Sequence, residues 1–111
     1  MENKVLQLKD VLFLKKNNHF EQVAVEAIHL LEAENGYTVI HTKSDRFIYS
    51  MTLDKMEEIL PPSVFIRVHK SYIVNKLGVS GFEGNSLYVN NMKVPVSKSF
   101  RERVLELFKS I

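Results

Sequence analysis

Residues 30–42 read LLEAENGYTVIHT, and this stretch decides the class of fold. Asn35 and Gly36 lie between two runs that are rich in residues favouring strands. Asn-Gly is a preferred pair at the centre of a type I′ turn, because both central residues of that turn need a positive φ. The stretch therefore predicts an antiparallel hairpin that turns at these two residues.

Short strands separated by turn residues continue on both sides of this hairpin. Further strands are predicted at residues 11–14, 20–25, 46–49, 80–82, 87–89 and 92–96, with turns at Asn17-Asn18, Gly84-Asn85 and Asn90-Asn91. Asn and Gly suit such turns because they tolerate a positive φ. Pro95 cannot donate a hydrogen bond to a β ladder, so it is expected on an edge strand or at a bulge. The pattern indicates a mainly β, antiparallel fold.

Two helices are predicted among these strands, one short helix in the middle of the chain and one at the C-terminus. Residues 53–60 place their apolar side chains on one helical face, with Thr52 as N-cap and Pro61-Pro62 as the stop. Residues 99–102 match a capping box, and a stripe with helical spacing follows it. The stripe consists of Phe100, Val104, Leu107, Phe108 and Ile111. A short turn of helix within residues 69–75 is also allowed by the sequence.

The size and composition of the chain indicate one soluble domain. The chain has 111 residues, of which 45% are hydrophobic and 25% are charged. Zero cysteines exclude disulfides, thiolate zinc sites and cysteine nucleophiles. No window approaches the ~18 apolar residues of a membrane span, and the N-terminus lacks the apolar region of a signal peptide. The domain is therefore expected in the cytoplasm, with no membrane partner.

No motif in the sequence points to an enzyme, a metal or a cofactor. The four histidines do not cluster in sequence. In the hairpin register expected from the Asn-Gly turn, Leu30 faces His41 and His29 faces Thr42, which puts the two histidines on opposite sides of the ribbon. Nucleophile-elbow, zinc-protease, dinucleotide and Walker motifs are all missing from the sequence. No small-molecule substrate is expected.

Positive charge gathers in the second half of the chain. Residues 1–64 carry seven Lys or Arg against ten acids, whereas residues 65–101 carry six against the single acid Glu83. An excess of five positive charges in one region is typical of a surface that faces phosphates.

Two segments within this basic region are rich in hydrogen-bond donors. In the predicted strand that starts at residue 65, Arg67 and His69 alternate with apolar residues, so both are expected to leave the sheet where Lys70 and Ser71 begin a turn. A second group, residues 97–99, reads Ser-Lys-Ser and precedes the last helix. Such side chains bond phosphate oxygens, and a lysine can also donate to guanine O6 and N7.

The run FIRVHKSYIVN at residues 65–75 resembles the signature of LytTR DNA-binding domains of bacterial response regulators. Three more segments resemble this family in the same order. Residues 31–37 (LEAENGY) resemble its first DNA-facing loop, residues 52–60 its helix, and residues 94–98 (VPVSK) its final loop. The resemblance covers roughly residues 10 to 108, and four matching segments in the family's order make a chance match improbable.

The resemblance implies an elongated antiparallel β fold whose loops enter successive major grooves of duplex DNA, often as two copies on direct repeats. It implies that Lys70 and Lys98 read bases, although many members of the family carry Arg at these positions. It also implies that a third segment, residues 35–37, contacts DNA. The wider set of expected DNA-binding residues is Lys70, Lys98, Asn35, Gly36, Tyr37, His69, Ser71, Arg67 and Ser97. Three alternatives stay open: Tyr37 packs in the core, Arg67 pairs with an acid, and His69 bonds the backbone of its turn.

The resemblance also bears on domain organisation and partners. Residues 10–111 are expected to form the LytTR-like domain, and residues 1–9 a linker remnant or an N-terminal extension. The expected partner is double-stranded DNA, with an upstream receiver or sensor domain elsewhere in the protein. One rival is a β-rich protein-interaction module of a signalling system, whose binding would respond little to salt. An RNA-binding domain ranks behind it, because such domains display aromatic side chains on an exposed sheet face.

Overall fold

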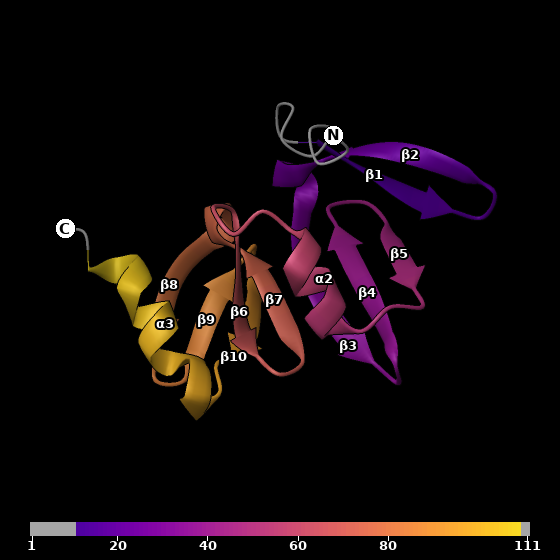
Figure 1. The fold of residues 1–111 in the computed structure, drawn as a ribbon. Coiled ribbons are helices and arrows are strands. Elements are labelled where there is room, and N and C mark those ends of the chain that lie inside the picture. Colours follow the sequence, from indigo (N-terminus) through magenta and orange to yellow (C-terminus); the bar gives the residue numbers. More distant parts are fainter. Residues whose placement is uncertain (1–10, 110–111) are drawn as a thin grey trace.

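The computed structural model describes residues 11–109, and β-strands dominate it (Figure 1). In chain order the strands are β1 (Val11–Lys16), β2 (His19–Ala24), β3 (Ile28–Glu34), β4 (Tyr37–Thr42), β5 (Arg46–Tyr49), β6 (Phe65–His69), β7 (Tyr72–Asn75), β8 (Val79–Glu83), β9 (Ser86–Val89) and β10 (Met92–Pro95). The α-helices are α2 (Leu53–Ile59) and α3 (Arg101–Leu105). Single 3₁₀ turns are η1 (Val25–Ala27), η2 (Lys76–Gly78), η3 (Lys98–Phe100) and η4 (Glu106–Phe108).

These strands form three antiparallel sheets. The central sheet has five strands in the order β5-β4-β3-β7-β6. A three-stranded sheet in the order β10-β9-β8 lies on one side of it, and the β1-β2 hairpin forms the third sheet. The domain measures 42 × 31 × 24 Å along its principal axes. The predicted fold class, an elongated and mainly β fold with two helices, is confirmed.

The turns lie where the sequence predicted them. Asn35 and Gly36 have φ values of 49° and 85°, as a type I′ turn requires. Positive φ values also occur at Asn17, Gly84 and at both Asn90 and Asn91. These four turns, between β1 and β2, β3 and β4, β8 and β9, and β9 and β10, are thus closed by residues that enter this region of φ at little cost.

Two apolar cores lie on the two faces of the central sheet. The core on the α2 side includes Leu31 and Ile73 together with residues of β1 and α2. The other core includes Leu30 and Val74 and joins the central sheet to the three-stranded sheet and α3, whose Val104 is fully buried. Neighbouring residues of one strand therefore enter opposite cores, as the period of two dictates.

The ends of the helices follow the prediction only in part. The Thr52 hydroxyl accepts a hydrogen bond from the Lys55 amide at 3.2 Å and caps α2, as predicted. The capping box predicted at residues 99–102 is not formed, because η3 precedes α3 and the N-cap residue, Phe100, offers no side-chain acceptor. In the predicted stripe Phe108 is exposed and stacks on Phe82, and Ile111 lies outside the described residues.

Two further predictions of local structure need correction. Residues 69–75 contain no helical turn; they hold the turn between β6 and β7, because Ile73 pairs with both β3 and β6 in the central sheet. In the β3-β4 hairpin Leu30 faces His41 as predicted, but a bulge places Ile28 instead of His29 opposite Thr42. Pro95 does lie on an edge strand, since β10 ends its sheet.

Within the described part of the chain, no helix combines the length and apolarity needed to cross a membrane.

Candidate nucleic-acid interface

The three loops suggested by the sequence lie along one edge of the molecule. Figure 1 shows the β3-β4 turn, the β6-β7 turn and the start of the C-terminal helical segment at the lower side of the view. The sheet register gives the same arrangement. Glu32, near the end of β3, faces Tyr72 at the start of β7. The turns at residues 35–36 and 70–71 therefore lie at the same end of the strands of the central sheet, along one edge of the molecule.

Backbone hydrogen bonds fix these segments to one another. The Ala33 amide donates to the Ser71 carbonyl at 2.9 Å, which ties the end of β3 to the β6-β7 turn. The Ser97 amide donates to the Val68 carbonyl at 3.0 Å, which ties the segment before η3 to β6. Because backbone groups make both contacts, the order of the loops along the edge depends on the fold and not on side-chain rotamers.

Lys70 and Lys98 are the exposed cations of this edge. Lys70 lies in the β6-β7 turn, and Lys98 opens η3. Among residues 11–109, neither ammonium group has an acid within ion-pair distance. Both lysines are therefore available to an outside polyanion, and they come from adjacent segments of the same edge.

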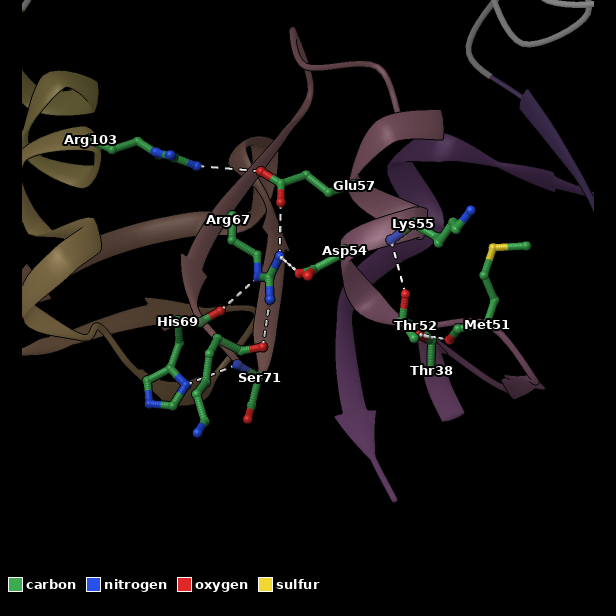
Figure 2. Close-up of polar contacts among 11 residues, drawn as sticks. Thr38, Met51, Thr52, Asp54, Lys55, Glu57, Arg67, His69, Ser71 and Arg103 are labelled. Atoms are coloured by element: carbon green, nitrogen blue, oxygen red, sulfur yellow. Dashed lines mark hydrogen bonds and ion pairs between the residues drawn. The ribbon is translucent and has the colours of Figure 1, made fainter. Parts of the chain in front are cut away.

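Arg67 does not share this exposure. Its side chain is 7% exposed and lies over the sheet face that carries α2 (Figure 2). One terminal nitrogen, Nη1, donates to Asp54 at 2.9 Å and to Glu57 at 2.8 Å. The expectation that Arg67 leaves the sheet beside His69 is wrong, because a bulge between these two residues breaks the alternation and α2 supplies two acids that pair with Arg67. The alternative reading, an ion pair with an acid, describes the geometry.

Arg67 supports the β6-β7 turn from within. Its Nε donates to the His69 carbonyl at 2.8 Å, and its Nη2 donates to the Lys70 carbonyl at 2.6 Å (Figure 2). Turn carbonyls that point inward need such donors, since unpaired buried carbonyls are costly. The guanidinium therefore holds the backbone that presents Lys70.

His69 and Ser71 complete the turn. The Ser71 amide donates to Nδ1 of the His69 ring at 3.1 Å, so a neutral ring carries its proton on Nε2. The ring also contacts Tyr72 edge-on, with 5.6 Å between centroids. Burial, and to a smaller extent the charge of Glu32, raises the pKa of Tyr72. His69 thus bonds the turn backbone with one nitrogen and keeps a donor on the other.

The third loop displays its residues fully. Asn35, Gly36 and Tyr37 are all exposed, and Tyr37 as a whole residue is 47% exposed, so the alternative that Tyr37 packs in the core is wrong. A Cβ on Gly36 would meet no atom within 4 Å. This loop can approach a partner closely. It also carries an exposed acid, Glu34, which makes it less cationic than the other two segments.

Ser97 is half-buried and works mainly in the backbone. Besides the bond of its amide to Val68, its carbonyl accepts from the Phe100 amide at 3.0 Å. These two bonds shape the segment from which Lys98 projects.

Arg101 belongs to the same edge, although the sequence did not single it out. Its Nη1 donates to the Gly84 carbonyl and to Asn85 Oδ1, both at 3.0 Å, and the guanidinium lies over the ring of Phe82. These contacts join the β8-β9 turn to the start of α3. The only signal in the sequence was the position of Arg101 inside the basic window of residues 65–101.

In the described range of residues 11–109, no three His, Cys, Asp or Glu side chains gather as a metal would need. The pKa of His29 is lowered by burial and then by the charges of Lys43 and His41, far from the edge that carries Lys70 and Lys98.

Comparison with known proteins agrees with this geometry. The protein-family model described as LytTr DNA-binding domain matches residues 18–109 of the chain. The chain belongs to the LytTR family. A solved LytTr DNA-binding domain, from a methyl-accepting/DNA response regulator of Bacillus cereus, superposes with a TM-score of 0.75 at 27% identity, covering 91% of this chain and 98% of that one.

Two curated relatives carry names from signal transduction. The sensory transduction protein LytT of Enterococcus faecalis is 36% identical over 86 residues, which are 70% of this chain and 35% of that protein. The transcriptional regulatory protein LytR of Staphylococcus aureus is 32% identical over 89 residues, 68% of this chain and 36% of that protein. This LytTR chain thus spans about a third of the length of these relatives.

Proposed function

We propose that this LytTR chain is the sequence-specific double-stranded DNA-binding part of a bacterial transcriptional regulator. The observation that carries the proposal is the row of three segments along one edge, at residues 35–37, 70–71 and 97–98. Backbone bonds hold this row in place, and two exposed lysines project from it.

The dimensions of the domain support reading of successive major grooves. The longest axis of the domain is 42 Å, whereas one turn of B-DNA rises about 34 Å. A domain of this length is long enough to place loops in two grooves on one side of a duplex. We place Lys70 and Lys98 at base edges, and the third loop, residues 35–37, in a neighbouring contact.

Phosphate contacts would supply most of the affinity. The donors suited to this task are the free ring nitrogen of His69, the hydroxyl of Ser71 and the guanidinium of Arg101, which border the base-reading lysines. Phosphate contacts carry no sequence information but position the protein on the duplex. Binding should therefore weaken steeply as salt rises.

The match covers only about a third of the length of the relatives, which supports a proposal for the rest of the regulator. We propose that residues 10–111 form the DNA-binding domain, and that residues 1–9 lead from an upstream receiver or sensor domain or extend the N-terminus. The domain would work in the cytoplasm, with two copies on directly repeated sites.

Selection of bound duplexes from a random pool tests the proposal. An enriched motif, repeated at a fixed spacing, is the expected result. A pool without enrichment, or binding to a protein partner that ignores salt, would favour a protein-interaction module instead.

Three lysine variants then assign the base contacts. Lys70→Ala and Lys98→Ala should each cost about 1–3 kcal/mol on the selected duplex and relax preference at one position. Lys43→Ala is the matched control. Lys43 is exposed just after β4, and the other end of β4 begins in the loop at residues 35–37. Equal losses on selected and scrambled duplexes for Lys70→Ala would remove its base-reading role.

A further inference from the structure

One carboxylate of α2 connects the two lysine-bearing segments. Glu57 Oε1 accepts from Arg67 Nη1 at 2.8 Å, and Glu57 Oε2 accepts from Arg103 Nη1 at 3.4 Å (Figure 2). The two oxygens of the group thus bind cations from two different parts of the chain. Arg67 comes from β6 and Arg103 from α3.

Each of these cations is attached to a DNA-facing segment. Arg67 bonds the carbonyls of His69 and Lys70, so any shift of its guanidinium moves the turn that presents Lys70. Arg103 lies in α3, which continues directly from the η3 turn that starts at Lys98. Glu57 is therefore the shared partner of the two supports.

An aromatic ring makes a second connection at the same place. The Phe100 ring lies 5.8 Å from the Arg67 guanidinium and 4.9 Å from that of Arg103. Phe100 belongs to η3 together with Lys98. Two arginines that share one carboxylate and one ring have little freedom to move independently.

We propose that Glu57 is a positioning residue for DNA specificity: it fixes the spacing between the Lys70 turn and the Lys98 segment, so that both lysines meet their bases together. This inference rests on the proposed function. It adds a role for an acid of α2, a helix that carries none of the proposed DNA contacts.

Electrostatics alone predicts that loss of the Glu57 charge strengthens DNA binding, whereas the positioning role predicts a loss of preference for the selected site. Removal of an acid near a DNA-binding surface strengthens binding to every duplex, because the repulsion of phosphates falls. Glu57→Gln should change stability little, because the glutamine oxygen can still accept a hydrogen bond from the buried Arg67, which keeps its ion pair with Asp54. The Glu57–Arg103 pair is exposed, and exposed ion pairs contribute little. A loss of preference for the selected site, without a loss of general affinity or of folding, is therefore the signature of positioning.

The test compares Glu57→Gln with Glu58→Gln in the full chain. Glu58 is the adjacent exposed acid on α2, and it forms no ion pair within residues 11–109. Because both variants replace a glutamate by a glutamine, they change the net charge equally. Affinities for the selected duplex and for a scrambled duplex are measured on the same preparation. Their ratio is independent of the fraction of active protein. Thermal unfolding is followed in parallel.

Glu57→Gln should lower the ratio of selected to scrambled affinity by about tenfold, equivalent to about 1.4 kcal/mol, whereas Glu58→Gln should leave it unchanged. Phe100→Leu, which keeps apolar bulk but removes the ring between the arginines, should lower the same ratio without any change of charge. Equal ratios for the two glutamate variants, with wild-type preference intact, would overturn the positioning role and leave the proposed function standing. A wild-type chain without preference for any duplex would instead defeat the proposed function itself.

Discussion

Asn75→Ala is expected to destabilise the domain strongly. Asn75 is 2% exposed at the end of β7, and it connects three parts of the chain. Its Nδ2 donates to the Val25 carbonyl at 3.0 Å and to the Ile28 carbonyl at 2.9 Å, while its Oδ1 accepts from the Leu77 amide at 2.8 Å. One side chain thus holds η1, the start of β3 and η2 together.

The size of the loss follows from these three bonds. A net contribution of about 1 kcal/mol for each hydrogen bond gives about 3 kcal/mol in total. The Val25 carbonyl keeps a second donor, the Ile28 amide, so its share is the smallest. The Ile28 carbonyl and the Leu77 amide lose these partners. We expect a loss of about 2–4 kcal/mol, or a fall in Tm of about 10 °C.

Denaturant unfolding at neutral pH measures this loss, with Asn18→Ala as the control. Asn18 is exposed in the β1-β2 turn, and its substitution should change the free energy of unfolding by less than about 0.5 kcal/mol. Asn75→Asp should be worse than Asn75→Ala, because a carboxylate cannot donate to two carbonyls. If Asn75→Ala proved as stable as Asn18→Ala, the bonds would not hold the fold as described.

Three further predictions concern pH and local stability. The hydrogen bond from Lys16, and to a smaller extent that from the Arg46 amide, holds the pKa of Asp45 below its ordinary value of 3.8. The contribution of Asp45 to stability is therefore present above pH 3.8 and is lost as the pH falls through the lower pKa of the folded state. Unfolding of Asp45→Asn across the pH range should show a deficit at neutral pH that vanishes in acid, and a deficit independent of pH would contradict the ion pair. Gly36→Ala should cost about 1 kcal/mol in unfolding free energy because its φ is 85°, and an unchanged midpoint would argue against the type I′ turn. Thr52→Ala should also cost about 1 kcal/mol through the lost N-cap, whereas Thr52→Ser should retain most of the stability.

The fold could be predicted because its hairpins are encoded locally. Asn35-Gly36 and Asn90-Asn91 close turns that need positive φ, and few other residues enter that region readily. The strands on either side alternate with a period of two, which the sequence displays directly.

Arg67 and His29 show where local reasoning fails. Alternation alone would turn Arg67 outward, but the bulge before His69 and the acids of α2 determine its place. The same kind of bulge shifts His29 out of the expected register. Bulges depend on the partner strand and on packing, so a pattern read along one strand does not reveal them.

The residues that support the candidate interface were hidden for a related reason. In the sequence, Glu57 is one of three acids in the predicted helix at residues 53–60, and Arg101 is one of six cations in the basic region of residues 65–101. Their partners lie 10 to 46 residues away for Glu57 and 16 to 17 residues away for Arg101. Only the tertiary fold brings such residues together, whereas the lysine-bearing segments could be recognised from their own sequence.

Tethered cleavage of DNA tests the central claim most directly, and the absence of cysteine from the chain makes it practical. A cleaving reagent would be attached to Tyr37→Cys, to Ser99→Cys and, as a control, to Asn91→Cys, whose turn lies beside η2 through the bond from Asn90 to Gly78 at 3.0 Å. The account predicts cuts from the first two positions on one duplex, about 10 base pairs apart, and none from the third. Cleavage from Asn91 with none from Tyr37 or Ser99 would show that another face of the domain meets DNA.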